Sequence, residues 1–374
     1  MSSNAVVDEM IKNEGAGKPA LSFFSFGLGD RLFKGMTWFF AALVLVLAVL
    51  TAGSLYLTSQ ASIKAFGWKF LFSSDWDPIK QIFGAVPFVY GTLVSSCLSL
   101  LIAVPLGLGI SLFLTELAPQ RLREPVAFLV DTLAAIPSVV YGLWGMFVLA
   151  PFMRVHVDPI LMKAGNTFIG LLVCFTVFPL VRNLVNRFLK GWAGSAVGFL
   201  AGIGAGVLVG TSDLPFFKGP STGLSLFTAG VILSIMILPT ITSISREVFE
   251  AIPNVYRESA RALGATSWET IQLSVLKASR AGVVGAVMLG LGRALGETMA
   301  VTMVIGNTPQ VSPDLLASGH SMASVIANEF TEANGDIYLA DLSEIGLLLM
   351  DITMVLNIAA HLLVWVSTRK FGRI

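Results

Sequence analysis

The sequence AGVVGAVMLGLGRALGETMAVTMVI, residues 281–305, is apolar except for Arg293, Glu297 and a few hydroxyl groups. A helix needs about 20 mostly apolar residues to cross a bilayer core about 30 Å thick. This stretch is long enough, and five others like it lie elsewhere in the chain. We therefore predict an all-α, polytopic membrane helix bundle with a core of six helices. The predicted spans are 36–57, 88–114, 126–153, 224–244, 281–305 and 345–366.

The composition excludes an ordinary soluble domain and a disordered chain. Of the 374 residues, 55% are apolar and 13% are charged, and the mean hydropathy is +0.80. The net charge of +1 argues against a nucleic-acid partner. The two cysteines, Cys97 and Cys174, both lie in apolar stretches, so we expect neither a disulfide framework nor a zinc cluster. We expect no metal and no cofactor.

Two weaker apolar stretches, 167–181 and 192–210, predict an inserted helical hairpin over residues 167–210. Lysine and arginine are enriched in cytoplasmic loops. With this hairpin and a cytoplasmic N-terminus, 17 basic residues fall on the cytoplasmic side and 6 on the other, whereas without it the split is 14 to 9. Both termini are therefore predicted to be cytoplasmic. At the N-terminus we expect a polar segment over 1–35 without a cleaved signal peptide, and at the C-terminus a cytoplasmic tail over 367–374.

The sequence predicts no nucleotide-binding domain. No loop exceeds about 40 residues, which is too short for an independent soluble domain. The nearest approach to a phosphate-binding loop is GAGKP at 15–19, where a hydroxyl residue does not follow the lysine and Lys12 replaces the leading glycine. We therefore expect that the chain is not an enzyme and that a separate partner chain supplies the energy for its work.

Arg293 and Glu297 lie near the centre of the stretch quoted first. On a continuous helix, four residues return to nearly the same face, so the two side chains can pair. One charge at mid-bilayer costs about 2.5–3.5 kcal/mol, which favours a position facing the bundle interior or a wet cavity. Because arginine presents five donors in a planar fork suited to phosphate-like oxygens, the pair predicts an anion pathway. The alternative is a structural ion pair between helices or subunits. Further polar contacts are predicted from Thr298, Thr302 and Asn307.

Glycine and proline spacing predicts close packing and helix breaks. Glycine recurs at every fourth position from residue 194 to residue 210, and Gly292 and Gly296 have the same spacing, which in lipid favours close helix contact. Pro137 and Pro239 lie inside apolar stretches and predict kinks or breaks. A hydroxyl residue directly follows each proline, so these positions either line a pathway or are simple kinks.

Residues 245–280 form the longest predicted cytoplasmic loop and contain two short helices. Asn254 is placed to cap the first helix. Thr266 and Glu269 fit a capping box for the second, over residues 267–279. A short helix fixed at both ends is suited to transmitting force. The alternative is a surface helix that lies against the membrane.

The first loop helix carries a motif. Glu258, Ser259 and Ala260, with Gly264 six positions after the glutamate, resemble the EAA loop of permease subunits in bacterial ABC importers. The family has alanine in place of Ser259, and the chain departs from the family's motif again at 274–277. Gly264 also stands where a left-handed residue would end the helix. In that family the loop helix docks in a cleft of the cytoplasmic ATPase subunit. The resemblance implies these docking residues: Tyr256, Glu258, Ala260, Arg261 and Gly264.

A second set of motifs resembles the permeases of phosphate importers. The motifs are GLGRALGETMA at 290–300 followed by IGN at 305–307, PSVVYGLWG at 137–145 and SVIANEF at 324–330. The resemblance implies a type I importer in the bacterial cytoplasmic (inner) membrane. It also implies that Arg293 and Glu297 correspond to the family's charged pair in the translocation path. It implies a permease core over 88–366 after a first transmembrane helix over 36–57. It also implies three partners besides the lipid bilayer: a homologous second permease subunit, an ATP-binding cassette ATPase dimer and an extracytoplasmic phosphate-binding protein.

Three alternatives stay open at this point. Sulfate and molybdate permeases share the loop and the fold, and one arginine does not distinguish tetrahedral oxyanions. An ion-coupled secondary transporter also has broken helices near the bilayer midplane, although we find no clear internal repeat in this sequence. A membrane scaffold or sensor would keep the docking loop but would not need Arg293 in a wet cavity.

Overall fold

The computed structural model describes residues 26–163, 201, 203–204 and 222–371. The predicted hairpin over 167–210, with its glycine repeat, lies almost wholly outside the described residues, as does most of the polar segment over 1–35. By its internal contacts the chain divides into two units, Met1–Ser54 and Leu55–Ile374. The helix bundle described below belongs to the second unit.

Every regular element in the described part of the chain is a helix. Among the described residues, six continuous helical stretches are long and apolar enough to cross a membrane, which agrees with the predicted all-α, polytopic bundle. These stretches are Gly29–Phe66, Val86–Leu117, Ser138–Lys163, Leu226–Glu250, Ser267–Gly296 and Asp336–Leu362. The α-helices are α2 (Phe26–Phe66), α3 (Lys69–Phe72), α4 (Val86–Leu112), α5 (Gln120–Ala135), α6 (Ser138–Trp144), α7 (Ala150–Phe152), α10 (Leu226–Glu250), α11 (Asn254–Ala262), α12 (Ser267–Thr270), α13 (Lys277–Gly296), α14 (Met299–Val304), α15 (Met322–Glu329) and α16 (Asp336–Phe371). Four π-helical turns join or extend them: η1 (Phe113–Leu117), η2 (Gly145–Leu149), η3 (Met153–Val157) and η4 (Ile271–Leu276).

The predicted single span over 126–153 is wrong, because the chain breaks at Pro137. Helix α5 ends at Ala135, and Ile136 has an extended backbone with ψ 128°. A proline disfavours the helical conformation of the residue before it, which explains the end of α5. A new helix starts at Ser138, directly after the proline, and runs as a spanning stretch to Lys163.

The predicted span over 281–305 is displaced toward its N-terminal side. The spanning helix begins at Ser267 and ends at Gly296, and Glu297 has an extended backbone with ψ 124°. The separate helix predicted over 267–279 is therefore the first part of this span. The residues beyond the break form the short helix α14, so the quoted stretch contains two helices rather than one.

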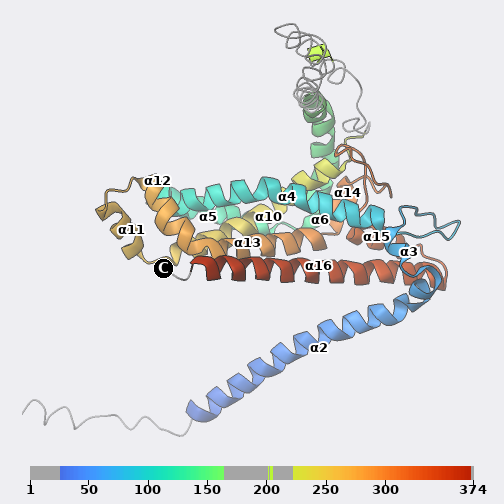
Figure 1. The fold of residues 1–374 in the computed structure, drawn as a ribbon, viewed down its shortest axis with the longest axis horizontal. Coiled ribbons are helices and arrows are strands. Elements are labelled where there is room, and N and C mark those ends of the chain that lie inside the picture. Colours follow the sequence, from blue (N-terminus) through green and yellow to red (C-terminus); the bar gives the residue numbers. More distant parts are fainter. Residues whose placement is uncertain (1–25, 164–200, 202, 205–221, 372–374) are drawn as a thin grey trace, which may run out of the picture. The chain divides into compact units, whose positions relative to one another are not determined.

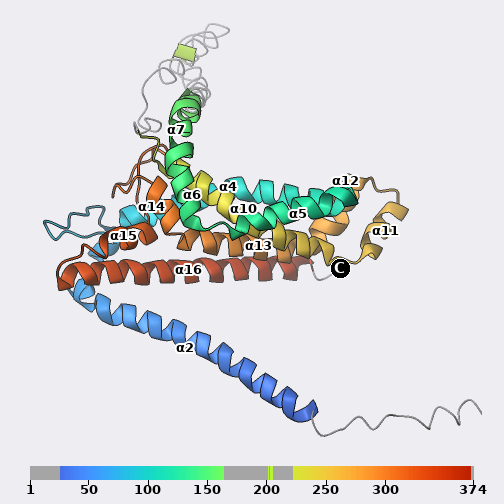
Figure 2. The ribbon, with the colours of Figure 1, turned by 180° about the vertical axis from the view of Figure 1, so that it is seen from behind.

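Helix α10 lies at the centre of the bundle, between α4 and α13 (Figures 1 and 2). Glycines allow the close approach on both sides. A β-carbon added at Gly230 of α10 would lie 2.8 Å from the Leu98 β-carbon on α4. One added at Gly290 of α13 would lie 2.8 Å from the Ile241 side chain on α10. At both positions the glycine backbone therefore packs directly against side chains of the neighbouring helix.

The motif PSVVYGLWG has a packing role in the structure. A β-carbon added at Gly142 would lie 2.6 Å from the Met303 sulfur, and one at Gly145 would lie 2.7 Å from the Val304 side chain. These two glycines therefore bring α6 and η2 against α14. The other glycine pair makes no such contact with the described residues: apart from neighbouring backbone of α13 itself, no heavy atom lies within 4 Å of an added β-carbon at Gly292 or Gly296. This face of α13 is open in the isolated chain.

The motif SVIANEF joins the elements at the end of the bundle that carries α3 and α15 (Figure 1). Its glutamate, Glu329, accepts hydrogen bonds from Trp76 Nε1 at 3.0 Å and from the Tyr338 hydroxyl at 2.5 Å. Its first residue, Ser324, lies 2.7 Å from Nδ1 of the buried His320. Burial lowers the pKa of the His320 imidazole to about 4, so the ring is neutral near pH 7.

The packing at Gly91 on α4 can be tested. A β-carbon there would lie 2.0 Å from the His320 carbonyl oxygen, a backbone atom that cannot rotate away. We expect Gly91→Ala to destabilise the protein by about 1–3 kcal/mol, as overpacking does, and to lower its unfolding temperature in detergent. Gly109→Ala is the matched control on the same helix, because nothing lies within 4 Å there and alanine is favoured over glycine by up to about 1 kcal/mol. Equal losses in both variants would contradict the packing described.

Candidate functional site

Arg293 lies in the last turn of α13, directly before the break in the chain. The end of a helix carries partial negative charge, which favours a cation there. The side chain is exposed in the isolated chain, and its Nη1 lies 3.5 Å from the Thr240 hydroxyl on α10. This contact is long, so most of the five guanidinium donors are available to solvent or to a ligand.

Glu297 does not pair with Arg293, contrary to the sequence-based expectation. Its Oε1 accepts a hydrogen bond of 3.3 Å from the backbone N–H of Ala300, in the first turn of α14. The pairing expected between positions four apart needs a continuous helix, and the helix ends at Gly296. No ion pair joins these two residues in the described part of the chain. The carboxylate instead satisfies one of the unpaired N–H groups at the start of α14.

The remaining predicted polar residues shape the segment after the break. The Thr298 hydroxyl donates to the Gly296 carbonyl at 3.3 Å, and the Thr302 hydroxyl donates to the Thr298 carbonyl at 2.7 Å. The Asn307 amide donates to the Thr302 carbonyl at 2.9 Å, and Asn307 itself has a left-handed backbone with φ 50°. Each of these donors is directed at a backbone carbonyl and not at Arg293.

Thr240 is the residue that the structure adds to this site. It follows Pro239 within α10, and the contact between α10 and α13 brings its hydroxyl to Arg293. The sequence signal was the hydroxyl residue directly after a proline in an apolar stretch. That signal does not identify the neighbouring helix, so Arg293 and Thr240 could be joined only once the packing was known.

Helix α11 stands at the end of the bundle opposite α15 and contains no buried residue (Figure 1). Its N-cap is Pro253, so the predicted capping by Asn254 is wrong; the Asn254 Oδ1 accepts a hydrogen bond from Arg257 instead. The predicted helix stop is confirmed, because Gly264 has φ +86°. The predicted capping box is also confirmed, because the Thr266 and Glu269 side chains each bond the backbone N–H of the other residue.

The surface of α11 and α12 exposes large apolar side chains among charged ones. Leu263 is 90% exposed, and the side chains of Val255, Tyr256 and Trp268 are more than half exposed. Glu258 and Arg261 are exposed on the same helix. A set of apolar side chains that the chain itself leaves uncovered, bordered by charges, is typical of a protein contact surface. We refer to residues 254–268 as the loop surface.

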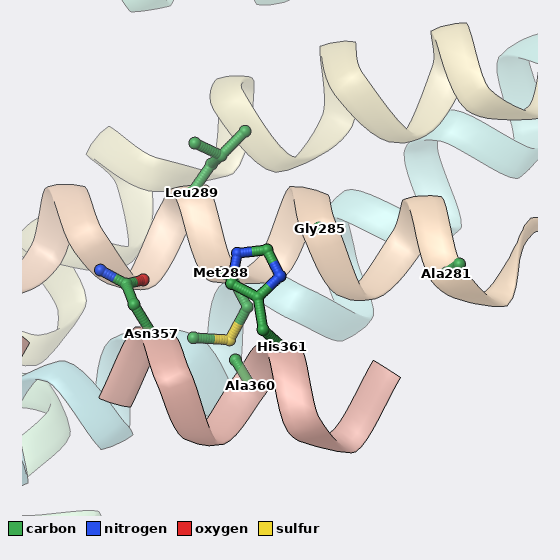
Figure 3. A pocket seen from close by; sticks show the side chains of 7 residues that line it. All are labelled: Ala281, Gly285, Met288, Leu289, Asn357, Ala360 and His361. Atoms are coloured by element: carbon green, nitrogen blue, oxygen red, sulfur yellow. The ribbon is translucent and has the colours of Figure 1, made fainter. Parts of the chain in front are cut away.

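A cavity of about 350 Å³ lies between α13 and α16 (Figure 3). Its polar lining consists of Asn357 and His361, both on α16, and the α13 side is apolar. No lysine or arginine of the described residues lines it, so this part of the chain gives the cavity no cation for recognition of a phosphate-like anion. Arg293 is therefore the better candidate for contact with an anion. The full lining is Ala281, Gly285, Met288, Leu289, Asn357, Ala360 and His361.

Comparison with known proteins identifies the family. The family model described as "Binding-protein-dependent transport system inner membrane component" matches residues 103–372. The chain is 42% identical over 345 residues to a Mesorhizobium japonicum protein named "Phosphate transport system permease protein PstC", covering 92% of this chain and 93% of the relative. It is 41% identical over 344 residues to a Haemophilus influenzae protein with the same name, covering 92% and 96% of the two chains. A Mycobacterium tuberculosis relative named "Phosphate transport system permease protein PstC 2" is 36% identical over 337 residues, covering 89% and 91%. The chain therefore belongs to the family of binding-protein-dependent transport system inner membrane components, the permease family that includes these relatives.

Proposed function

We propose that this chain is the transmembrane permease subunit of an ATP-driven importer for inorganic phosphate. The observation that carries the proposal is an exposed guanidinium, Arg293, at a break in a membrane-spanning helix, in a chain whose relatives are named phosphate permeases. The chain would form half of the translocation pathway. A homologous second permease subunit would form the other half, and an extracytoplasmic phosphate-binding protein would deliver the anion.

Arg293 would act as one stepping site for phosphate. Its planar fork can donate two parallel hydrogen bonds to one anion, and the Thr240 hydroxyl stands within reach of the same place. Because the Glu297 carboxylate accepts a hydrogen bond from the Ala300 N–H, it leaves the donors of the Arg293 guanidinium available to an anion. Thr298, Thr302 and Asn307 would line the segment after the break, where their hydroxyl oxygens and amide oxygen still have lone pairs to offer.

The loop surface would be the contact for a cytoplasmic ATP-binding cassette ATPase dimer, which would hydrolyse the ATP. The exposed side chains of α11 support this assignment, since no residue of the helix is fully buried against its own chain. The docking residues would be Tyr256, Glu258, Ala260, Arg261 and Gly264. With this assignment the α11 end of the bundle would face the cytoplasm of a bacterium, across its inner membrane. The excess of basic residues in the predicted cytoplasmic segments supports the proposal that both termini lie on the same side.

Transport of another tetrahedral oxyanion, sulfate or molybdate, is the alternative. The guanidinium alone does not discriminate between phosphate, sulfate and molybdate, because all three anions present oxygens in a tetrahedral arrangement. The names of the relatives favour phosphate. An ion-coupled secondary transporter is not favoured, because the family works with binding proteins.

Removing the guanidinium tests the pathway. We expect Arg293→Gln to lower the initial rate of phosphate uptake by about tenfold or more, the effect of losing one or two charge-assisted hydrogen bonds. Uptake of radiolabelled inorganic phosphate by cells that depend on this importer is the measurement. Arg121→Gln is the control, because Arg121 is an exposed arginine on α5 outside the proposed pathway. Unchanged uptake in a complex that still assembles would show that Arg293 has no role in transport.

Reversing a charge on the loop surface tests the docking. Glu258 is exposed on α11, so Glu258→Lys should leave the bundle folded. We expect the ATPase activity stimulated by the binding protein to fall by about tenfold in purified importer, since reversing a charge at an interface disturbs its electrostatic complementarity. Glu124→Lys, an exposed reversal on α5, is the matched control and should retain the activity. A normal stimulated rate in Glu258→Lys would argue against docking at this surface.

Cysteine labelling tests the membrane topology, including the predicted hairpin over 167–210. With Cys97 and Cys174 replaced by serine, we expect a cysteine at position 190 to react with an impermeant maleimide only when the cytoplasmic side is accessible. A cysteine at position 80, in the segment between α3 and α4, should react only from the other side. Labelling of both positions from the same side would contradict the hairpin.

A further inference from the structure

Arg257 is the residue that joins α11 to the transmembrane helices. Its Nε and Nη2 donate to one carboxylate oxygen of Glu116 at 2.9 and 2.8 Å. Nη2 also donates to the Phe249 carbonyl at 2.8 Å, and Nη1 donates to the Ile252 carbonyl at 2.7 Å. A further bond of 3.2 Å joins Nη1 to Asn254. One guanidinium therefore holds α11, the last turn of α10 and the end of α4 in a fixed relation.

The ion pair between Arg257 and Glu116 is shielded from water. The two side chains are only 13% and 7% exposed, so solvent screens their attraction weakly. The pair formed nearby by Arg246 and Asp131 differs, since its atoms are 3.8 Å apart and the Asp131 side chain is 50% exposed. The negative end of α10 also attracts the guanidinium, because the Phe249 carbonyl in its last turn accepts a hydrogen bond from Nη2.

Two of the places where α11 contacts the bundle are π-helical turns. Glu116 lies in η1, the π-helical turn that follows α4. The Tyr256 carbonyl of α11 accepts a hydrogen bond of 3.0 Å from Ser274, which lies in η4 at the start of the span that ends at Gly296. π-Helical turns are short and often occur at functional positions in long helices. Motion of α11 would be transmitted to α4 by Arg257. It would be transmitted by Ser274 to the span that contains Arg293.

We propose that Arg257 is the positioning residue that transmits movement of the loop surface to the transmembrane helices, acting through Glu116. The inference rests on the proposed function, because it assumes that the ATPase moves α11. No residue of α11 is fully buried, so the Arg257 guanidinium, whose side chain is only 13% exposed, is the helix's main rigid link to α4 and α10. Lysine keeps the positive charge but lacks the planar set of donors with which the guanidinium bonds Glu116, Phe249 and Ile252 at the same time.

The test uses the complete importer with its ATPase and binding protein, in proteoliposomes. Three quantities are measured: photo-cross-linking of the ATPase to a benzophenone probe on Ala262→Cys, the ATPase rate, and radiolabelled phosphate transported per ATP hydrolysed. For Arg257→Lys we expect normal cross-linking and an ATPase rate within about twofold, with phosphate transported per ATP reduced about tenfold, the effect of losing charge-assisted hydrogen bonds. Glu116→Gln should reduce the same ratio. Arg121→Lys, an exposed arginine on α5, is the matched control and should not.

The outcomes separate this inference from the docking proposal. Normal cross-linking with an unchanged ratio of phosphate to ATP in Arg257→Lys would overturn the inference and leave the docking proposal standing. Loss of cross-linking in Arg257→Lys would also overturn it, since the residue would then only hold the loop surface in shape. If the unsubstituted importer gives no cross-link to its ATPase, the docking proposal fails and the inference fails with it.

Discussion

The close approach of α10 to α4 and α13 is the constraint on which the other features depend. Glycines on all three helices permit it, and a methyl group at Gly230 or Gly290 would already collide with the neighbouring helix. In a membrane, helix association gains little from the hydrophobic effect, so such close contact supplies much of the packing energy. The same contact brings Thr240 to Arg293 near the break and sets the last turn of α10 against Arg257.

The sequence predicted the features that depend on local chemistry and missed those that depend on competition between neighbours. Apolar length was enough to find the spans, and the capping box at Thr266 and the stop at Gly264 follow from side-chain and backbone preferences of a few residues. The end of α5 could also have been predicted from the sequence, because Pro137 disfavours the helical conformation at Ile136. A count of apolar residues over a long window averages across such a position, and so it joined two helices into one predicted span.

The break at Glu297 was harder to predict, because no proline marks it. A pair such as Arg293 and Glu297 on a continuous helix is worth only about 0.2–0.5 kcal/mol, so a modest competitor can displace it. In the structure the competitor is the start of α14, where the carboxylate accepts from the Ala300 N–H. Helix α14 in turn packs against Gly142 and Gly145. That contact joins segments more than 150 positions apart in the sequence, and no local pattern encodes it.

The two arginines show how hydrogen-bond satisfaction separates a structural cation from one able to bind a ligand. Arg257 makes five hydrogen bonds and is nearly buried, so it has little capacity left for another partner. Arg293 makes one long contact and is exposed in the isolated chain. An arginine placed inside a membrane protein needs partners for its donors, because an unsatisfied charged donor away from water costs several kcal/mol. Water or an anion must therefore supply at Arg293 what Glu116 and the backbone supply at Arg257, which is the physical reason for placing the transported anion at the break in α13.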